Sequence, residues 1–171
     1  TFDQFRRFVR DQAHAAGKEI ALHIEGRETE LDKTVIEKIG DPLKHMIRNA
    51  IDHGIETPGE RSKSGKPRTG SITLRSYHQE GNIYIEIIDD GKGLNRTKLR
   101  EKAEALGLVK PGEEIPDHRL LATIFTPGFS TAENVGELSG RGVGMDVVKT
   151  NIDDLRGNVE LESEEGEGTT V

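Results

Sequence analysis

The sequence of 171 residues predicts an α+β fold in a single domain, with enough length for a substantial buried core. Over residues 43–54, Leu, Met, Ile and Ala recur at i, i+3, i+4, i+7 and i+8, the spacing of an apolar helix face. Over 71–78 and 82–89, alternating apolar residues flank Glu80-Gly81, which is typical of a β-hairpin. Helices and paired strands are therefore both expected.

In the first half of the chain, the spacing of apolar residues separates helices from a strand. Phenylalanine and valine recur at helical spacing over 1–17, whereas isoleucine and leucine alternate over 18–24. Pro42 is typical of the first turn of a helix, so a new helix is expected to open at Asp41-Pro42. The predicted elements are helices at 1–17, 31–39 and 41–54, a strand at 18–24, and a polar surface segment at 58–69.

Beyond the hairpin, the sequence predicts a charged helix at 95–106 with Leu99 and Ala103 facing inward. The stretch 107–140 is rich in glycine and proline and has one short predicted helix near 119–125. A stretch of this kind is often a functional lid, so we expect a lid at about 94–139 with few buried apolar contacts. The remaining predicted elements are a helix at 142–156, a strand at 157–163, a turn at 164–168 and a strand at 169–171.

Composition excludes several classes of protein. A net charge of −7 argues against a protein that coats nucleic acid or an anionic membrane. The absence of cysteine excludes a disulfide framework and a zinc–thiolate site, and it is typical of a reducing compartment. No apolar run approaches the length of about 20 residues that spans a bilayer, and no signal-peptide pattern opens the chain. Direct membrane insertion is therefore not expected.

The helix at 43–54 carries an unusual polar face. His45, Asn49, Asp52 and His53 lie together opposite the apolar stripe, with Arg48 at their edge. Solvated helix faces are usually rich in Lys and Glu, whereas imidazole, amide and carboxylate groups ligate metals and orient phosphates. The polar face therefore indicates a ligand site, and an ordinary solvated face is the alternative.

A second candidate site follows the strand at 82–89. Because alternate side chains on a strand share a face, Asp89 points inward with the isoleucines and Asp90 does not. A buried carboxylate is costly without a hydrogen-bond donor, and an adenine amine would supply one. Gly91 and Gly93 permit positive φ and close backbone approach. The alternative is a plain Asp-Gly turn after a strand.

A third candidate is Ser139-Gly-Arg-Gly-Val-Gly144-Met145-Asp, which runs into a helix. Backbone N–H groups at a glycine-rich helix start can bind phosphates. The segment is not a P-loop, because the Lys and Ser/Thr of that motif are missing. It also fails the dinucleotide pattern, since Met145 stands at the last glycine position. A glycine-rich helix cap without a ligand is the alternative.

Two further segments complete the set, Phe125–Thr131 and Gly166–Thr170. In this order, the five motifs resemble the GHKL nucleotide-binding fold of histidine kinases, gyrase-type ATPases, Hsp90 and MutL. The similarity runs from about Phe8 to Val171 and is closest to the catalytic domain of the CheA family of chemotaxis histidine kinases. It implies a two-layer α/β sandwich (the Bergerat fold), with a mixed, mostly antiparallel sheet covered by helices on one face and a long ATP lid.

The resemblance also implies roles for individual residues. Asn49 would coordinate Mg²⁺ on the ATP phosphates, and Asp89 would accept from adenine N6 with Thr169 nearby. His45 stands where many relatives carry a Glu that can activate water, which favours phosphoryl transfer over hydrolysis. The implied catalytic residues are His45 and Asn49. The implied nucleotide-binding residues are Arg48, Asp52, His53, Asp89, Gly91, Gly93, Phe125, Phe129, Ser130, Gly140, Arg141, Gly142, Val143, Gly144, Met145 and Thr169.

The function implied is that of an ATP-dependent protein-histidine kinase catalytic domain. The histidines outside the polar helix face show no phosphoacceptor pattern, so the substrate histidine is expected on a separate domain. Expected partners are phosphoacceptor, dimerisation and SH3-like domains of the same kinase, chemoreceptors, the coupling protein CheW and, indirectly, response regulators. The expected location is the cytoplasmic side of receptor arrays. The alternatives are a GHKL ATPase clamp and a nucleotide-binding module without transfer activity.

Overall fold

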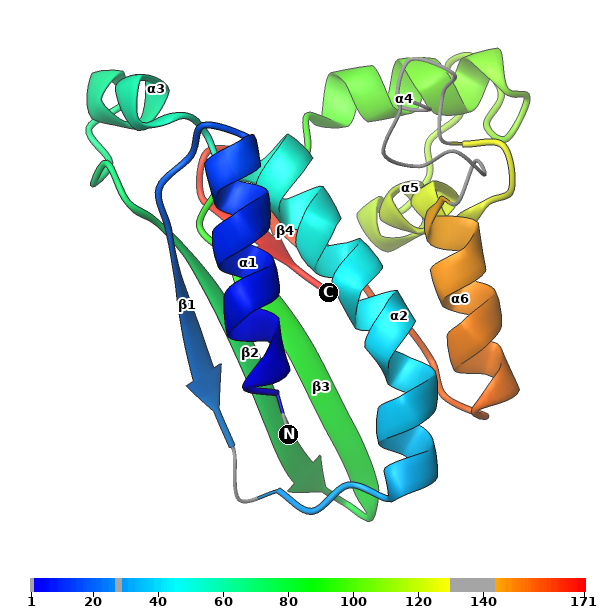
Figure 1. Ribbon diagram of the computed structural model, residues 1–171. Coiled ribbons are helices and arrows are strands. Elements are labelled where there is room, and N and C mark those ends of the chain that lie inside the picture. The colour runs from blue at the N-terminus through cyan, green and yellow to red at the C-terminus, as the bar shows by residue number, and fades with distance from the viewer. Residues whose placement is uncertain (1, 27–28, 130–143) are drawn as a thin grey trace. The chain divides into compact units, whose positions relative to one another are not determined.

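A five-stranded sheet with strand order β1-β2-β3-β5-β4 organises the first part of the structure (Figure 1). The structure is a computed structural model that describes residues 2–26, 29–129 and 144–171. Contacts divide these residues into one unit at 1–94 and 163–171 and a second at 95–162. The strands are β1 (Ile20–Glu25), β2 (Gly70–Gln79), β3 (Asn82–Asp89), β4 (Glu162–Glu164) and β5 (Gly168–Thr170).

The sheet is mixed and mostly antiparallel, as expected. β1 pairs with β2 in parallel, whereas β2–β3 and β3–β5 are antiparallel. The predicted hairpin is confirmed, with Glu80 and Gly81 at φ 52° and 80° in its two-residue turn. Its register pairs Leu74 with Ile87, so both lie on the buried face, each no more than 2% exposed.

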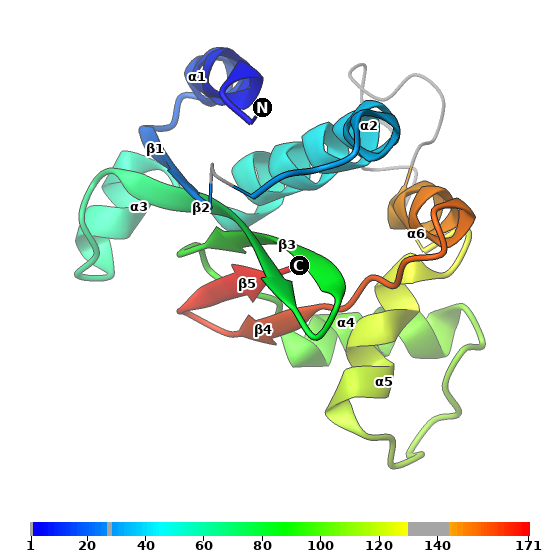
Figure 2. The same cartoon turned by 90° about the horizontal axis from the view of Figure 1, so that it is seen from below.

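Two helices cover one face of this sheet, which gives the predicted two layers (Figures 1 and 2). They are α1 (Gln4–Ala15) and α2 (Lys33–Asn49), and the carboxylate of Asp32 caps α2 by accepting from the Thr34 N–H. Burial of the apolar stripes between the helices and the sheet supplies the main favourable term. The fully buried apolar side chains of this core include Phe5, Val9, Leu43, Ile47, Ile51, Ile72, Leu74 and Ile87.

The prediction of separate helices at 31–39 and 41–54 is wrong, because α2 is one helix that continues through Pro42. Proline removes one helical hydrogen bond at a cost of about 3 kcal/mol. Pro42 and Leu43 are both fully buried, and this packing offsets the loss. After Asn49 the helix widens into the π-helical turn η1 (Ala50–Gly54), closed by the Ile55 N–H donating to the Ala50 carbonyl at 2.8 Å.

The segment 58–69, predicted as a polar surface excursion, is also different from expectation. It contains the short helix α3 (Pro58–Lys63), capped by the Thr57 hydroxyl, and the side chain of Arg61 is completely buried. A buried arginine requires charged or polar partners. Glu56 and Pro67 are near Arg61 in the sequence, but its third partner, Asp90, lies 29 positions away, so the local pattern did not indicate this burial.

The predicted strand at 157–163 is largely wrong, since only Glu162–Glu164 forms a strand. In the sheet order, β4 neighbours β5 alone, and β5 covers only Gly168–Thr170. A ladder is no longer than its shorter strand, so 157–161 has no strand pairing. Val159 and Leu161 of this segment are half-buried without belonging to a strand.

The second unit is built from α4 (Arg96–Ala105), α5 (Asp117–Ala122), the 3₁₀ turn η2 (Thr123–Phe125) and α6 (Met145–Asp154). The helices predicted at 95–106 and near 119–125 are confirmed. The expectation of few buried apolar contacts is wrong for 95–129, because this segment has a small core of its own. Its buried apolar residues are Leu99, Ala103, Val109, Leu120, Leu121, Phe125 and Phe129.

Candidate functional site

The predicted polar face lies at the end of α2 and in η1. Asn49 is the last residue of α2, and both it and His45 are half-buried. Asp52 and His53 lie in η1 and are exposed. The opposite stripe is buried, as the sequence pattern predicted. The π-helical turn from Ala50 to Ile55 contains one residue more than an α-helical turn, a distortion that is frequent at functional sites.

Arg48 takes a position that the sequence did not predict. Its guanidinium carbon lies 5.7 Å from the centroid of the Phe8 ring in α1, within the range of a cation–π contact. Its Nε is buried and has no hydrogen-bond partner. Arg48 thus joins α2 to α1 through the Phe8 ring, on the side of α2 that faces α1.

Lys18 is a residue that sequence analysis missed. Its Nζ donates to the Ile51 carbonyl at 2.5 Å and to the Asp52 carbonyl at 3.2 Å, so it caps η1 from outside the helix. Burial lowers the pKa of Lys18, and the nearby Asp52 carboxylate opposes that effect. The only sequence signal was a basic residue two positions before β1, which is too common to single out.

Asp89 is the buried carboxylate that the strand register predicted. Its residue is 7% exposed, whereas the side chain of Asp90 is 44% exposed. It lies opposite Thr169 in the β3–β5 ladder, and its Oδ1 accepts from the Gly91 N–H at 2.9 Å. Burial raises the pKa of Asp89 to about 6, while hydrogen bonds from the Gly91 and Thr169 backbones lower it. A carboxylate can accept about four hydrogen bonds, so further acceptor capacity is present for a ligand.

The glycines around Asp89 are required by protein backbone that lies against them. A Cβ on Gly91 would lie 2.2 Å from the Gly54 carbonyl oxygen. Gly93 has φ 70°, and a Cβ there would lie 2.2 Å from the Glu164 carbonyl oxygen. A Cβ on Gly54 would lie 3.3 Å from Asp89 Oδ1. The end of η1 and the Asp89 carboxylate are therefore close neighbours.

Ser163 is a second residue that the sequence did not reveal. Its Oγ lies 2.8 Å from Thr169 Oγ1 and accepts from the Leu94 N–H at 2.8 Å. The hydroxyl of Thr169 is thus held next to Asp89 by a residue in β4. Because Ser163 meets Thr169 only when β4 and β5 pair, no local pattern pointed to it.

The other predicted site residues belong to the second unit or lie outside the described residues. Phe125 and Phe129 are buried within that unit, and Lys102 Nζ lies 4.6 Å from the centroid of the Phe129 ring. Gly144 is extended and precedes Met145, the first residue of α6. Outside the described residues lie Ser130, Gly140, Arg141, Gly142 and Val143.

The donor set can be compared with what Mg²⁺ requires. Among residues 2–26, 29–129 and 144–171, no group of three or more His, Cys, Asp or Glu side chains could hold a metal ion. Mg²⁺ commonly binds through one or two protein ligands plus substrate phosphates and waters. A single amide oxygen from Asn49 fits that pattern.

In the same described ranges, no helix is long and apolar enough to cross a membrane.

Comparison with known proteins places this geometry in a family. Residues 38–171 match the family described as histidine kinase-, DNA gyrase B-, and HSP90-like ATPase. The chain belongs to this ATPase family. The matched region contains Asn49 at the end of α2 and the paired residues Asp89 and Thr169.

Several curated relatives of this ATPase domain are about half identical to it. Chemotaxis protein CheA of Bacillus subtilis is 49% identical over 98% of this chain, which covers 25% of that protein. Sensor histidine kinase CheAY of Helicobacter pylori is 53% identical over 99% of the chain and 21% of that protein. Chemotaxis protein CheA of Salmonella typhimurium is 51% identical over 99% of this chain, which covers 25% of that protein. The chain thus spans a quarter or less of these three relatives.

A solved structure has the same fold. The histidine kinase domain of a blue-light activated histidine kinase from Erythrobacter litoralis matches with a TM-score of 0.51 and 17% sequence identity. The match covers 97% of this chain and 59% of that one. It supports the two-layer ATPase fold and, at this identity, the fold alone.

Proposed function

We propose that this chain binds Mg²⁺–ATP and transfers the γ-phosphoryl group to a histidine on a separate domain. The observation that carries the proposal is the buried Asp89 carboxylate at the end of β3, 7% exposed and flanked by Gly54 and Thr169. A buried carboxylate with spare acceptor capacity suits an exocyclic amine, which adenine has and guanine lacks at the equivalent position. Membership in the ATPase family supports the same ligand.

Each residue then has a distinct task. Asp89 accepts from the adenine amine, with the Thr169 hydroxyl beside it. Asn49 supplies one oxygen to Mg²⁺, which when bound neutralises charge on the phosphates. Such transfer depends mainly on positioning and charge stabilisation, so His45 would orient the attacking imidazole rather than activate water.

The proposed partners are those that the resemblance to CheA-type kinases implies. A phosphoacceptor domain would supply the histidine, and dimerisation and SH3-like domains would belong to the same kinase. Chemoreceptors and CheW would assemble with that kinase at receptor arrays on the cytoplasmic side, and response regulators would receive the phosphoryl group from the acceptor. The short coverage of the relatives agrees with a catalytic domain of a multidomain protein.

ATP turnover with and without an acceptor tests the proposal. The chain is incubated with Mg²⁺ and ATP labelled in the γ-phosphate, alone or with the phosphoacceptor domain of one of the CheA relatives. We expect acid-labile label on the acceptor and slow turnover without it. Equal phosphate release in both reactions would identify an ATPase instead, and binding without turnover would identify a nucleotide-binding module. An acceptor with its histidine replaced is the control.

A further inference from the structure

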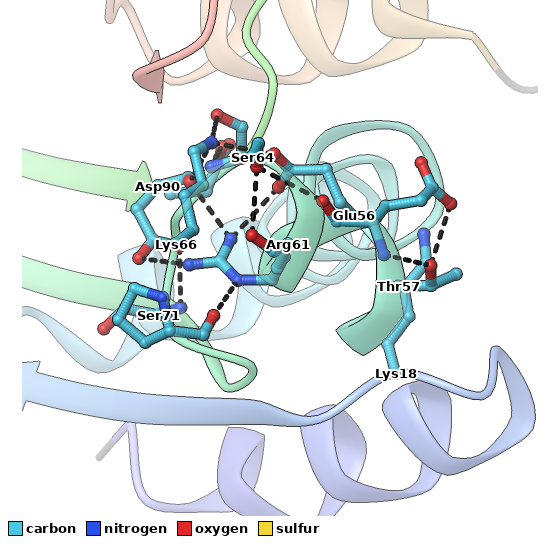
Figure 3. A network of polar contacts seen from close by, with 12 residues as sticks. Lys18, Glu56, Thr57, Arg61, Ser64, Lys66, Ser71 and Asp90 are labelled. Carbon is cyan, nitrogen blue, oxygen red and sulfur yellow. Dashed lines mark hydrogen bonds and ion pairs between the residues drawn. The ribbon is translucent and has the colours of Figure 1, made fainter.

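A charge network centred on a buried arginine lies beside the turn that follows Asp89 (Figure 3). At its centre is Arg61 of α3, whose side chain is 1% exposed. Its Nη2 donates to Asp90 Oδ2 at 3.0 Å, and its Nη1 donates to Glu56 Oε1 at 3.0 Å and to the Asp90 carbonyl at 3.2 Å. Its Nε donates to the Pro67 carbonyl at 2.6 Å. Every edge of the guanidinium therefore has an acceptor.

Lys66 also binds the turn that follows Asp89. Its Nζ donates to the carbonyls of Asp90 at 3.1 Å and Gly91 at 2.9 Å, and to Glu56 Oε2 at 2.8 Å. The pKa of Glu56 is lowered overall. Burial acts to raise it, but the hydrogen bond and charge of Lys66 and the charge of Arg61 outweigh that effect. Two cations thus face two carboxylates, and the network is neutral as a whole.

The network acts on the peptide that orients Asp89. Because a trans peptide is planar, the Asp90 carbonyl and the Gly91 N–H point in opposite directions. Arg61 and Lys66 bind that carbonyl on one side, and the Gly91 N–H on the other side donates to Asp89 Oδ1 at 2.9 Å. Asp90 Oδ1 also accepts from the Ser71 N–H at 2.8 Å, which ties the turn to β2. The direction of the Asp89 carboxylate is therefore linked to Arg61.

We infer that Arg61, assisted by Lys66, is a positioning residue for adenine recognition by Asp89. The inference rests on the proposed function and extends it to a segment that the sequence presented as a surface excursion. A buried ion pair need not add stability, because desolvation offsets much of its attraction. The planar guanidinium of Arg61 binds the Asp90 carbonyl and carboxylate at the same time and so can fix the peptide that orients Asp89. A lysine at position 61 lacks this planar, two-pronged geometry.

The test uses Arg61→Lys and Lys66→Met, with Arg75→Lys as the control. Arg75 also bridges two elements, pairing with Glu25 at 2.7 Å, but its side chain is 42% exposed and it lies outside the network. Affinities for ATP and GTP are measured by calorimetry, and the Asp89 carboxyl is titrated by carbon-13 NMR without nucleotide. We expect the preference for ATP over GTP to fall about tenfold in Arg61→Lys, less in Lys66→Met, and not at all in the control.

The NMR titration separates positioning from general stability. If the Gly91 N–H turns away from Asp89, the pKa of Asp89 rises in both network variants, whereas a merely structural loss lowers only the unfolding temperature. An unchanged ATP preference together with an unchanged Asp89 titration would overturn the inference. If Arg61→Lys fails to fold, Lys66→Met decides the matter by the same two readouts. If the unsubstituted chain does not prefer ATP, the proposed function fails, and the Asp89 titration still reports whether the network positions that carboxylate.

Discussion

The Lys92 N–H donates to the Gly54 carbonyl at 2.9 Å and so joins the turn after β3 to the last residue of η1. The same carbonyl excludes a side chain at Gly91, where a Cβ would lie 2.2 Å from it. The helix that ends in Asn49 and η1 and the strand that carries Asp89 are therefore held together by backbone contacts. The proposed metal ligand and the proposed adenine acceptor belong to one fixed frame, which reduces the reorganisation needed on binding.

Replacement of Asn49 by alanine should remove the Mg²⁺ dependence of ATP binding. The substitution deletes the amide oxygen and improves helix propensity, so the unfolding temperature should change little. Phosphotransfer should fall on the order of a hundredfold or more, as for other losses of a charge-stabilising group. Calorimetric titration of ATP with and without Mg²⁺ measures the binding, and transfer of labelled phosphate to the acceptor measures the rate. Asn158→Ala is the exposed control. Transfer at an unchanged rate would rule out Asn49 as the metal ligand.

Asp89→Asn should weaken ATP binding about tenfold to a hundredfold, since a charge-assisted hydrogen bond contributes about 1.5–3 kcal/mol. The register alone suggests that Asp90→Asn would matter far less. The structure changes that expectation, because Asp90 pairs with the buried Arg61 and caps the Ser71 N–H. Asp90→Asn should therefore lower stability and weaken binding moderately. A normal ATP affinity in Asp89→Asn would contradict the assignment of the adenine acceptor.

The raised pKa of Asp89 predicts opposite pH dependences for stability and for binding. The ordinary pKa is 3.8 and the folded value is about 6, so the folded state holds the proton more tightly. The corresponding stability is complete below pH 3.8 and is lost as pH rises through about 6, by up to about 3 kcal/mol. ATP affinity should rise over the same window, since the ionised carboxylate is the stronger acceptor.

Denaturant unfolding and ATP titration between pH 4 and pH 7 measure both dependences, with Asp89→Asn as the reference at each pH. Ionisation of the ATP phosphates is common to both proteins and cancels in their difference. The stability advantage of the unsubstituted chain over Asp89→Asn should therefore shrink with rising pH while its affinity advantage grows. Parallel, pH-independent differences would show that Asp89 does not titrate in this range.

Hydrogen exchange should show that residues 95–129 are protected with and without nucleotide. α4 and α5 bury Leu99, Ala103, Leu120 and Leu121 within their own unit, and Arg96 pairs with Asp117 at 2.7 Å. Such contacts raise the free energy of local opening. Mass spectrometry with and without a non-hydrolysable ATP analogue tests this, with the β2–β3 hairpin as the protected reference. Rapid exchange of α4 and α5 in the absence of nucleotide would restore the view that 95–129 forms a mobile lid.

Sequence reasoning succeeded where periodicity and burial agree locally. The hairpin register followed from alternation, and with it the inward direction of Asp89 rather than Asp90. It failed where partners are distant in the chain. Arg61 and Asp90 are 29 positions apart, so nothing near Arg61 distinguished it from a surface arginine. The break predicted at Pro42 failed for a related reason, since the burial that favours a continuous α2 comes from tertiary packing.

The position of β5 between β3 and β4 bears on how this chain folds. Asp89 pairs with Thr169, so a newly synthesised β3 has an open edge on that side until residues 168–170 have left the ribosome. An unpaired edge can bind the strands of other chains, which makes partly made molecules prone to association. Pairing of β5 with β3 covers that edge at Ile88 and Asp89 and in the same step brings the Thr169 hydroxyl to Asp89. Assembly of the proposed nucleotide site and protection of this end of the β3 edge are thus one folding event.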